Sequence, residues 1–168
     1  TTDFSINESQ REDLLLKCQD KEGSVEVRKT IQNSSLEFQE KLFKCLENDL
    51  FLLCLDKYGN FVVQMLLEQE SPYIIKTFKA MILGKFALLS QNIYACRVVQ
   101  AFVKISNEMI NDQIQILEEI CGDTAILIFD PSANHVIQKI IEHFYPKLLK
   151  PIVTQISLNV SKLSNIDR

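Results

Sequence analysis

The chain has 168 residues, of which 46% are hydrophobic, and it carries a net charge of -4 at pH 7 with only four glycines and four prolines. This size can bury one continuous core, and so few turn-forming residues disfavour an all-β fold, so an all-α fold is expected. No apolar run reaches about 18 residues and no signal segment opens the chain, so neither membrane insertion nor secretion is indicated.

The first part of the chain predicts a polar lead-in and a group of three helices. The lead-in covers residues 1–12, and the helices cover residues 13–48. A capping box that opens at Ser9 is expected to start the first helix. Asp20 is a good N-cap for the second helix, and a second capping box opens the third helix at Ser34.

The same three-helix plan is predicted again for residues 49–84. Its first helix is expected over residues 50–55 and its second after Asp56. The third helix is entered through Ser71 and Pro72, because proline is tolerated at the first helical position.

Two further groups are predicted over residues 85–122 and 123–158. In the last group Pro146 can start the third helix, while Pro151 is expected to kink that helix or move its start. Residues 159–168 resemble the opening of a fifth group, so the chain is expected to belong to a longer array. The apolar residues of this end do not form the polar cap that a terminal repeat needs: Ile156, Leu158, Val160 and Leu163.

One nine-residue segment recurs in all four groups. Its copies begin at Asp20, Asp56, Asn92 and Asp130. Their fifth residues, Ser24, Asn60, Cys96 and Asn134, are separated by 36, 36 and 38 residues. This period is typical of stacked helical repeats. The two extra residues of the third interval are expected in a loop around residues 105–112 or near Gly122.

Each position of the segment has a physical interpretation. The leading Asp or Asn is expected to cap the helix, with Pro131 at the first helical position of the fourth copy. A small residue just before the fifth position indicates close helix packing: Gly23, Gly59, Ala95 and Ala133. An apolar stripe that follows predicts a buried face: Val62, Val63, Leu66 and Leu67, then Val98, Val99, Phe102 and Val103, then Val136, Ile137, Ile140 and Ile141.

Polar residues four positions apart lie one above the other on a helix. Three such pairs recur in register: Asn60 with Gln64, Cys96 with Gln100, and Asn134 with Gln138. A single pair would be an ordinary solvated face. The recurrence favours a functional surface.

At these residues the chain resembles the Pumilio (PUF) family of RNA-binding repeats. The resemblance covers roughly residues 13–158 and rests on the signatures Asn60-Phe61-x-x-Gln64, Cys96-Arg97-x-x-Gln100 and Asn134-His135-x-x-Gln138. It implies a right-handed α-solenoid of three-helix repeats of about 36 residues. It also implies that each repeat reads one base with two or three side chains, a rule that is the family's own. The order of the signatures resembles the first four of the family's eight repeats.

The resemblance implies roles for the signature residues. The first and fifth residues are implied to contact base edges: Ser24, Arg28, Asn60, Gln64, Cys96, Gln100, Asn134 and Gln138. The second residues are implied to stack between bases: Phe61, Arg97 and His135. Single-stranded RNA with the core 5′-U-A-U-3′ would run antiparallel to the repeats. No catalysis is implied, and the role would be that of a cytoplasmic regulator that binds messenger RNA in 3′ untranslated regions and recruits repressor or decay factors.

Other interpretations remain open. An armadillo- or HEAT-like scaffold could bind a protein segment instead, although it has no reason to keep the recurring Asn/Cys-x-x-x-Gln pairs. Phe61 could be a core residue, and Cys96 beside Arg97 could be an activated thiolate. The first copy has Val25 at the stacking position, and Arg28 could contact RNA or lie on a solvated face.

The remaining features carry weaker signals. Five cysteines, scattered without a C-x-x-C or Cys/His ligand spacing, indicate a reducing compartment and mostly buried thiols. His135 and His143 are expected not to share one continuous helix, so neither a metal site nor another cofactor is expected. The negative net charge argues mildly against nucleic acid, but stacking and base edges depend less on charge than phosphate contacts do.

Overall fold

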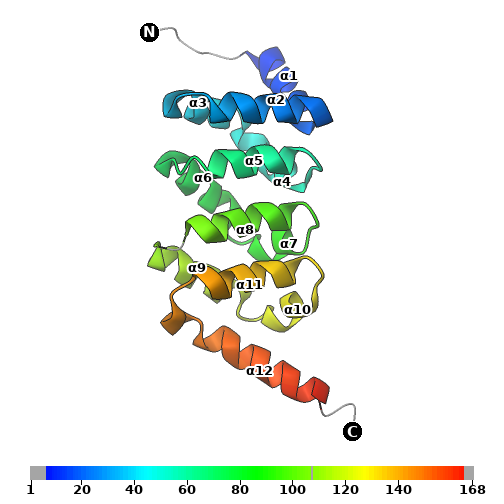
Figure 1. The fold of residues 1–168 in the computed structure, drawn as a ribbon, viewed down its shortest axis with the longest axis vertical. Helices are drawn as coiled ribbons and strands as arrows, with labels where there is room; N and C mark the ends of the chain where they lie inside the picture. The colour runs from blue at the N-terminus through cyan, green and yellow to red at the C-terminus, as the bar shows by residue number, and fades with distance from the viewer. Residues whose placement is uncertain (1–6, 107, 165–168) are drawn as a thin grey trace. The chain divides into compact units, whose positions relative to one another are not determined.

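A computed structural model of the chain describes residues 7–106 and 108–164, with side chains through residue 159. Within these ranges all the regular structure is helical, and no strand is present. The helices fall into two compact units, residues 1–81 and residues 82–168 (Figure 1). The all-α prediction is therefore confirmed for the described residues.

The first unit holds the first two predicted groups of helices. Its elements are α1 (Glu8–Gln19), α2 (Lys21–Gln32), α3 (Leu36–Leu46), the short 3-10 helix η1 (Glu47–Asp49), α4 (Leu50–Leu55), α5 (Gly59–Leu67) and most of α6 (Pro72–Ile82). Helix α2 packs beside α5, while α1 packs against α2 and α4 against α5 (Figure 1). The middle helices of the two groups thus lie side by side.

The second unit repeats this plan. Its elements are α7 (Phe86–Ser90), α8 (Ala95–Ile105), α9 (Ile110–Ile120), α10 (Thr124–Phe129), α11 (Ala133–His143), the 3-10 helix η2 (Pro146–Leu148) and α12 (Lys150–Ser164). Helix α8 packs beside α11, and α7 and α10 pack against α8 and α11 respectively (Figure 1). Helix α12 packs against α10.

The leading residue of each copy binds the start of its helix through the same two hydrogen bonds. Its side-chain oxygen accepts from the backbone amides two and three residues later, at 2.7–3.0 Å: Asp20 from Glu22 and Gly23, Asp56 from Tyr58 and Gly59, Asn92 from Tyr94 and Ala95, Asp130 from Ser132 and Ala133. Neither bond involves the backbone amide of the residue that directly follows the leading Asp or Asn. Pro131 lacks that amide and therefore fits there. The sequence suggested that Pro131 is the first helical residue, but α11 begins only at Ala133.

Two predicted helix starts are shifted. The capping box of α1 is formed by Asn7 and Gln10, whose side chains each accept from the other's backbone amide at 2.9 and 3.0 Å, and not by Ser9. Helix α1 therefore begins at Glu8, inside the predicted lead-in; residues 1–6 lie outside the described residues. Helix α3 is capped by Ser35, because the hydroxyl of Ser34 donates instead to Ile31 O at 2.9 Å.

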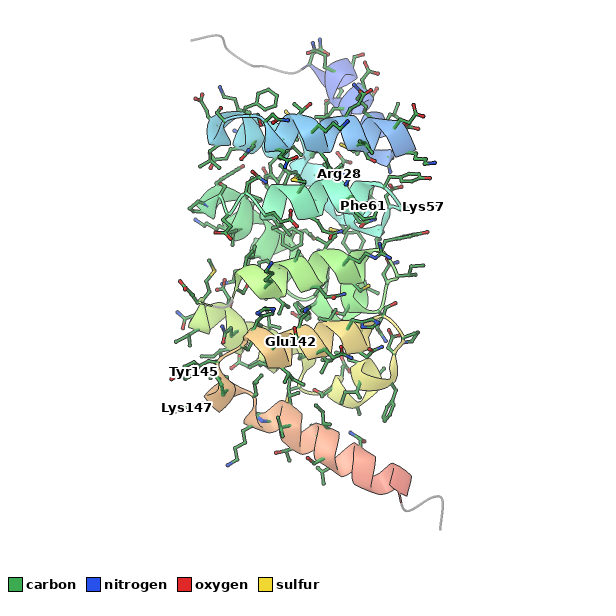
Figure 2. All side chains as sticks on the ribbon, in the orientation of Figure 1. Arg28, Lys57, Phe61, Glu142, Tyr145 and Lys147 are labelled. Atoms are coloured by element: carbon green, nitrogen blue, oxygen red, sulfur yellow. The ribbon has the colours of Figure 1, made fainter. Side chains whose placement is uncertain are left out.

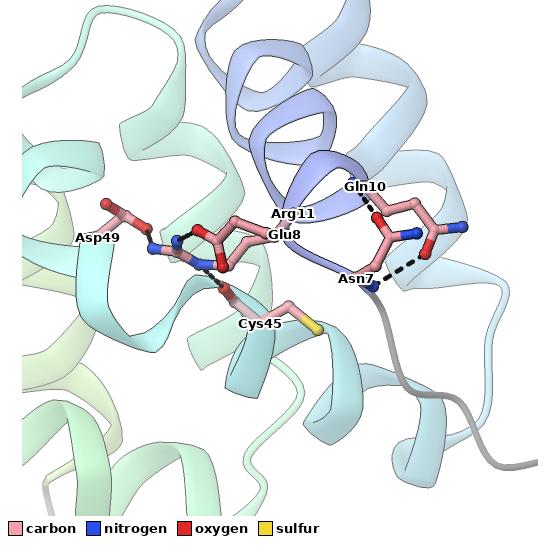
Figure 3. Close-up of polar contacts among 6 residues, drawn as sticks. All are labelled: Asn7, Glu8, Gln10, Arg11, Cys45 and Asp49. Carbon is pink, nitrogen blue, oxygen red and sulfur yellow. Dashed lines mark hydrogen bonds and ion pairs between the residues drawn. The ribbon is translucent and has the colours of Figure 1, made fainter.

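Arg11 of α1 joins the first helix to the start of the second group (Figure 3). Its guanidinium forms ion pairs with Asp49 and, at 2.8 Å, with Glu8, and its Nε donates to Cys45 O at 3.1 Å. The Asp49 carboxylate, and secondarily that of Glu8, holds the pKa of Arg11 above its ordinary value despite partial desolvation. α1 is thereby fixed to the junction of α3 and η1.

A buried glutamine in the third helix of two repeats closes the end of the middle helix. Gln39 donates from Nε2 to Ile31 O at 2.8 Å and to Ser34 O at 3.1 Å. Gln113 donates to Ser106 O at 3.0 Å and accepts from Tyr145 N at 2.8 Å. Carbonyl groups at a helix C-terminus lack partners within the helix, so these side-chain amides add hydrogen bonds to the end of the middle helix.

The predicted apolar stripes form the core with one exception. All four stripe residues of α5 and of α8 are buried, as are Val136, Ile137 and Ile140 of α11. Ile141 is 42% exposed, so its prediction as a core residue is wrong. The next α-helix after Ile141 is α12, and it packs against α10.

The helix bounds locate the insertion and show a continuous last helix. Counted from the fifth residue of the copy, α9 begins two residues later than α6, and α8 is two residues longer than α5. Four residues separate the two helices in both copies, so the two extra residues lie in α8 itself, at its end. Pro146 opens η2, Pro151 is the second residue of α12, and α12 crosses the predicted boundary at 158/159 without a break. The fifth repeat stays a prediction, and residues 165–168 lie outside the described residues.

Three of the five thiols are buried, as predicted: Cys18, Cys54 and Cys96. Burial raises the pKa of Cys54 to about 12. Burial, with a further contribution from the Asp56 carboxylate, raises the pKa of Cys18 to about 12. Cys121 is exposed.

The close approach of α2 to the end of α1 at Gly23 can be tested by substitution. A Cβ added there would lie 2.5 Å from Lys17 O, a backbone atom at the end of α1 that cannot move without shifting the helix. We expect Gly23→Ala to lower the free energy of unfolding by about 1–3 kcal/mol, the usual cost of overpacking. Gly122→Ala is the matched control, because nothing lies within 4 Å of its added Cβ. Urea unfolding followed by circular dichroism measures both; equal midpoints for the two variants would contradict the close packing.

Alkylation tests the burial of the thiols. Iodoacetamide reacts with thiolates, and a pKa of about 12 leaves roughly a thousandfold less thiolate than an ordinary cysteine has. We expect mass spectrometry of the folded protein to show rapid labelling of Cys121 and labelling of Cys18 and Cys54 only in denaturant. Cys121→Ser should abolish the fast reaction. Labelling of Cys18 at the rate of Cys121 would show that α1 opens readily.

Candidate nucleic-acid interface

The predicted site residues lie on the middle helices α2, α5, α8 and α11. In the last three, the small residue is the first helical residue and the first signature residue is the second. The cap before each helix therefore sets where the signature begins. Within each unit, neighbouring copies lie side by side through the packing of α2 with α5 and of α8 with α11.

The second copy forms a closed network around Asn60. This side chain is 0% exposed, and its Nδ2 donates to Asp56 O at 2.8 Å and to Lys57 O at 2.9 Å. Its Oδ1 accepts from Gln64 Nε2 at 2.9 Å. The predicted pair is thus together, but only Gln64, which is half-buried, reaches the surface.

The fourth copy has the same pattern in a more open form. Asn134 donates from Nδ2 to Asp130 O at 2.7 Å, and its Oδ1 accepts from Gln138 Nε2 at 3.4 Å. Asn134 is half-buried and Gln138 is exposed. Both members of this pair can therefore reach a ligand without unfolding the helix start.

The third copy replaces the amide by a thiol. Cys96 is 5% exposed, and its Sγ donates to Ile93 O at 3.5 Å. Burial raises the pKa of this thiol, and the nearby Arg97 charge only partly offsets it. A catalytic thiolate needs a lowered pKa, so this environment does not support the activated-thiolate alternative. Gln100, the partner position, is half-buried.

The first copy is built differently. The Ser24 hydroxyl is buried and donates to Lys21 O at 3.1 Å. Arg28 donates from Nε to Ser24 O at 3.3 Å, and its guanidinium carbon lies 5.3 Å from the centroid of the Phe61 ring. Figure 2 shows Arg28 reaching toward Phe61 on the neighbouring helix. Sequence reasoning missed this contact, because it joins two copies.

The predicted stacking residues differ in exposure. Phe61 is half-buried, whereas Arg97 and His135 are exposed. A half-buried ring is compatible with a stacking surface and with partial packing in the core. The arrangement therefore leaves planar or aromatic groups accessible at the second position of three signatures. Their contacts with RNA, like those of the base-edge residues, stay predictions.

Two further features near the signatures were not predicted correctly. Lys57 Nζ lies 5.2 Å from the centroid of the Tyr58 ring, a cation–π pair just before α5. A tyrosine recurs at this position as Tyr94, and that recurrence was the available signal. His135 and His143 do share one helix, α11, contrary to expectation. Eight residues span about 12 Å along a helix, too far for both to ligate one ion.

The described part of the chain offers no sign of a metal or a membrane segment. Among its side chains, no three His, Cys, Asp or Glu residues are grouped so as to bind a metal ion. None of its helices combines the length and the apolar character needed to cross a membrane.

Two of the curated proteins that are similar to this chain are named as Pumilio proteins. A Pumilio domain-containing protein of Schizosaccharomyces pombe is 26% identical over 136 residues, which are 80% of this chain and 20% of the relative. Putative pumilio homolog 13 of Arabidopsis thaliana is 29% identical over 127 residues, 74% of this chain and 21% of that protein. The chain thus spans about a fifth of the length of these relatives.

Solved structures share the fold. The Puf3 RNA binding domain bound to Cox17 RNA 3′ UTR recognition sequence site A matches with a TM-score of 0.84 at 27% identity, over 95% of this chain and 46% of that chain. PUF-8 in complex with PBE-RNA matches with a TM-score of 0.77 at 28% identity, over 87% and 42%. The predicted right-handed α-solenoid of three-helix repeats is confirmed by these matches.

The sequence itself matches the Pumilio-family RNA binding repeat over residues 50–72, 85–121 and 127–157. These ranges cover more than half of the chain and contain all three complete signatures. The armadillo- or HEAT-like alternative is therefore wrong as a family assignment. The chain belongs to the Pumilio family of RNA-binding repeat proteins.

Proposed function

We propose that the chain binds single-stranded RNA with the signature residues of α5, α8 and α11, one base per repeat. The observation that carries this proposal is the recurrence of a surface glutamine four residues after a fixed polar or thiol side chain, with a planar side chain beside it. Glutamine amides can read base edges, and planar groups can stack on base faces. The similar structures of Puf3 and PUF-8, which are both complexes with RNA, support RNA as the ligand.

The hydrogen bonds around Asn60 support uracil as the base of the second repeat. Both amide hydrogens of Asn60 bond to backbone carbonyls, so its Oδ1 faces Gln64 and takes one hydrogen of Gln64 Nε2. Gln64 Nε2 also donates to Asn60 O at 3.3 Å. The Gln64 amide is thereby held in one orientation, with Oε1 left for a ligand. A glutamine amide offers one donor group beside one acceptor, which matches the uracil edge. A base read through Nε2 would replace the longer of the two bonds, the one to Asn60 O. In the fourth repeat Asn134 makes one such backbone bond, to Asp130 O, and its Oδ1 accepts from Gln138 Nε2 at 3.4 Å.

The third repeat favours a different base. Cys96 directs its Sγ at Ile93 O, and a thiol is a weak partner for an amide. The Gln100 amide is therefore not held in the orientation that Asn60 imposes on Gln64. It can turn to present its acceptor to the amino group of adenine and its donor to the ring nitrogen. With the strand antiparallel to the repeats, as in the family, the core is 5′-U-A-U-3′.

We further propose a biological role, which the family membership and this ligand support. The chain would act in a cytoplasmic protein that binds messenger RNA in 3′ untranslated regions and lowers translation or stability. Repressor or decay-factor proteins would be its partners. Cross-linking of the protein to RNA in cells, followed by sequencing, tests this role; recovery of sites outside 3′ untranslated regions would contradict it.

Base identity is tested by fluorescence polarisation with short RNAs that contain U-A-U. We expect replacement of the central A, or of either U, to weaken binding by about 1–3 kcal/mol, since a buried polar group loses its partner. The same sequence as DNA is the control for charge. Equal binding of matched, mismatched and DNA oligonucleotides would contradict base reading and favour nonspecific attraction. No binding to any RNA, with capture of a protein segment instead, would favour a scaffold.

The stacking role is tested at Arg97. Its guanidinium is planar, so we expect Arg97→Ala to lose about 1–3 kcal/mol of RNA binding, and Arg97→Lys to recover only part, since lysine keeps the charge and loses the plane. Lys104→Ala, which removes an exposed charge from the same helix, is the matched control and should lose less. Gln100→Ala should instead reduce discrimination at the A position. Parental binding by Arg97→Lys at every salt concentration would assign Arg97 to phosphate.

A further inference from the structure

The Phe61 ring has one face covered by a side chain of the first repeat. The Arg28 guanidinium carbon lies 5.3 Å from the ring centroid (Figure 2), within the usual range of a cation–π contact. A base that stacks on an aromatic ring needs the same face at van der Waals distance. A guanidinium and a base cannot occupy it together.

The contacts of Arg28 hold it in this place. Its Nε donates to Ser24 O at 3.3 Å, one turn earlier on α2. Arg28 as a whole is half-buried. To admit a base, Arg28 would have to give up both the backbone contact and the ring, so its position opposes entry from the side of the first repeat.

The other signature positions of the first repeat offer no side chain that could contact a base edge or stack on a base. The Ser24 hydroxyl is 1% exposed and donates to Lys21 O, so it is directed into the helix and not toward a base edge. Val25, at the stacking position, is 37% exposed but has no planar group. The repeat therefore lacks both an accessible edge reader and a stacking surface of its own.

We propose that Arg28 closes the Phe61 ring on the side of the first repeat, so that specific RNA recognition ends at the second repeat. The inference rests on RNA binding by the signatures proposed above. Its consequence is that the uracil read by Gln64 is the last base recognised at the 3′ side. The first repeat then serves to support Phe61, and Arg28 is a specificity-determining residue because it sets the end of the site.

The experiment measures how much one extra nucleotide contributes. Dissociation constants of the 168-residue chain are compared for RNAs that end with U-A-U and for RNAs that carry one further 3′ nucleotide, with each of the four bases. For the parent we expect changes of less than about twofold and no preference among the bases. In Arg28→Ala the ring is uncovered, and the extra nucleotide should strengthen binding roughly fivefold or more, the lower range for one stacked base.

The ratio between the two RNAs within each variant removes most of the effect of the lost charge. Lys29→Ala is the matched control, because it removes an exposed charge from the same helix and leaves the Arg28–Phe61 contact. Its ratio should equal that of the parent. Arg28→Ser serves as a second variant, and thermal unfolding by circular dichroism verifies that each variant is folded.

The outcomes separate this inference from the proposed function. A parent that binds U-A-U but also gains from the extra nucleotide, or prefers one base there, overturns the inference and makes Arg28 a reader or a stacking surface. A folded Arg28→Ala and Arg28→Ser that gain nothing also overturn it, because the ring was then not closed by Arg28. A parent that does not distinguish U-A-U from mismatched RNA overturns the proposed function itself.

Discussion

The bond between a leading Asp or Asn and the amides that begin the middle helix is the constraint on which the site depends. The Asp56 carboxylate takes the amides of Tyr58 and Gly59, while its backbone carbonyl holds Asn60. The small residue between them lets the helix start lie against the end of the preceding helix. The capping residue, the small residue and the first signature residue therefore follow one another in a fixed order within five residues. Any shift of the helix start would turn the signature to another face.

Local patterns predicted most of the fold, whereas contacts between elements had to be seen in the structure. The period of 36 residues, the apolar stripes and the capping residues are properties of neighbouring positions, and they placed α4 and α6 correctly. Asn7 replaced the predicted Ser9 because two candidates with the same spacing compete, and sequence alone does not rank them. Ser35 replaced Ser34 because the Ser34 hydroxyl bonds to Ile31 O. The buried Gln39 and the Arg28–Phe61 pair join different helices. Such pairs depend on packing, so no local signal reveals them.

Equivalent residues of the repeats do not have equivalent environments. Asn60 is entirely buried and Asn134 is only half-buried, although both bond to the carbonyl four residues earlier and to a glutamine. A resemblance transfers a residue type to a position but does not transfer its exposure. For Asn60 the structure favours an indirect contribution, in which it orients Gln64, over direct contact with a base. The same pair in α11 is open enough for both side chains to contribute.

The net charge of -4 agrees with a proposed site that depends on base contacts more than on phosphate contacts. The leading carboxylates beside the signatures accept two helix amides each, and the amides of Gly23 and its neighbours hold the pKa of Asp20 below its ordinary value. Their charge is thus partly offset by the helix start. The Arg28 guanidinium lies over the Phe61 ring and is therefore not directed at a phosphate. Three stacked and read bases, as proposed, would contribute about 3–9 kcal/mol before association costs of at least about 4 kcal/mol. On this proposal the affinity for RNA is expected to be modest, and the glutamine orientations to matter more for specificity than for the strength of binding.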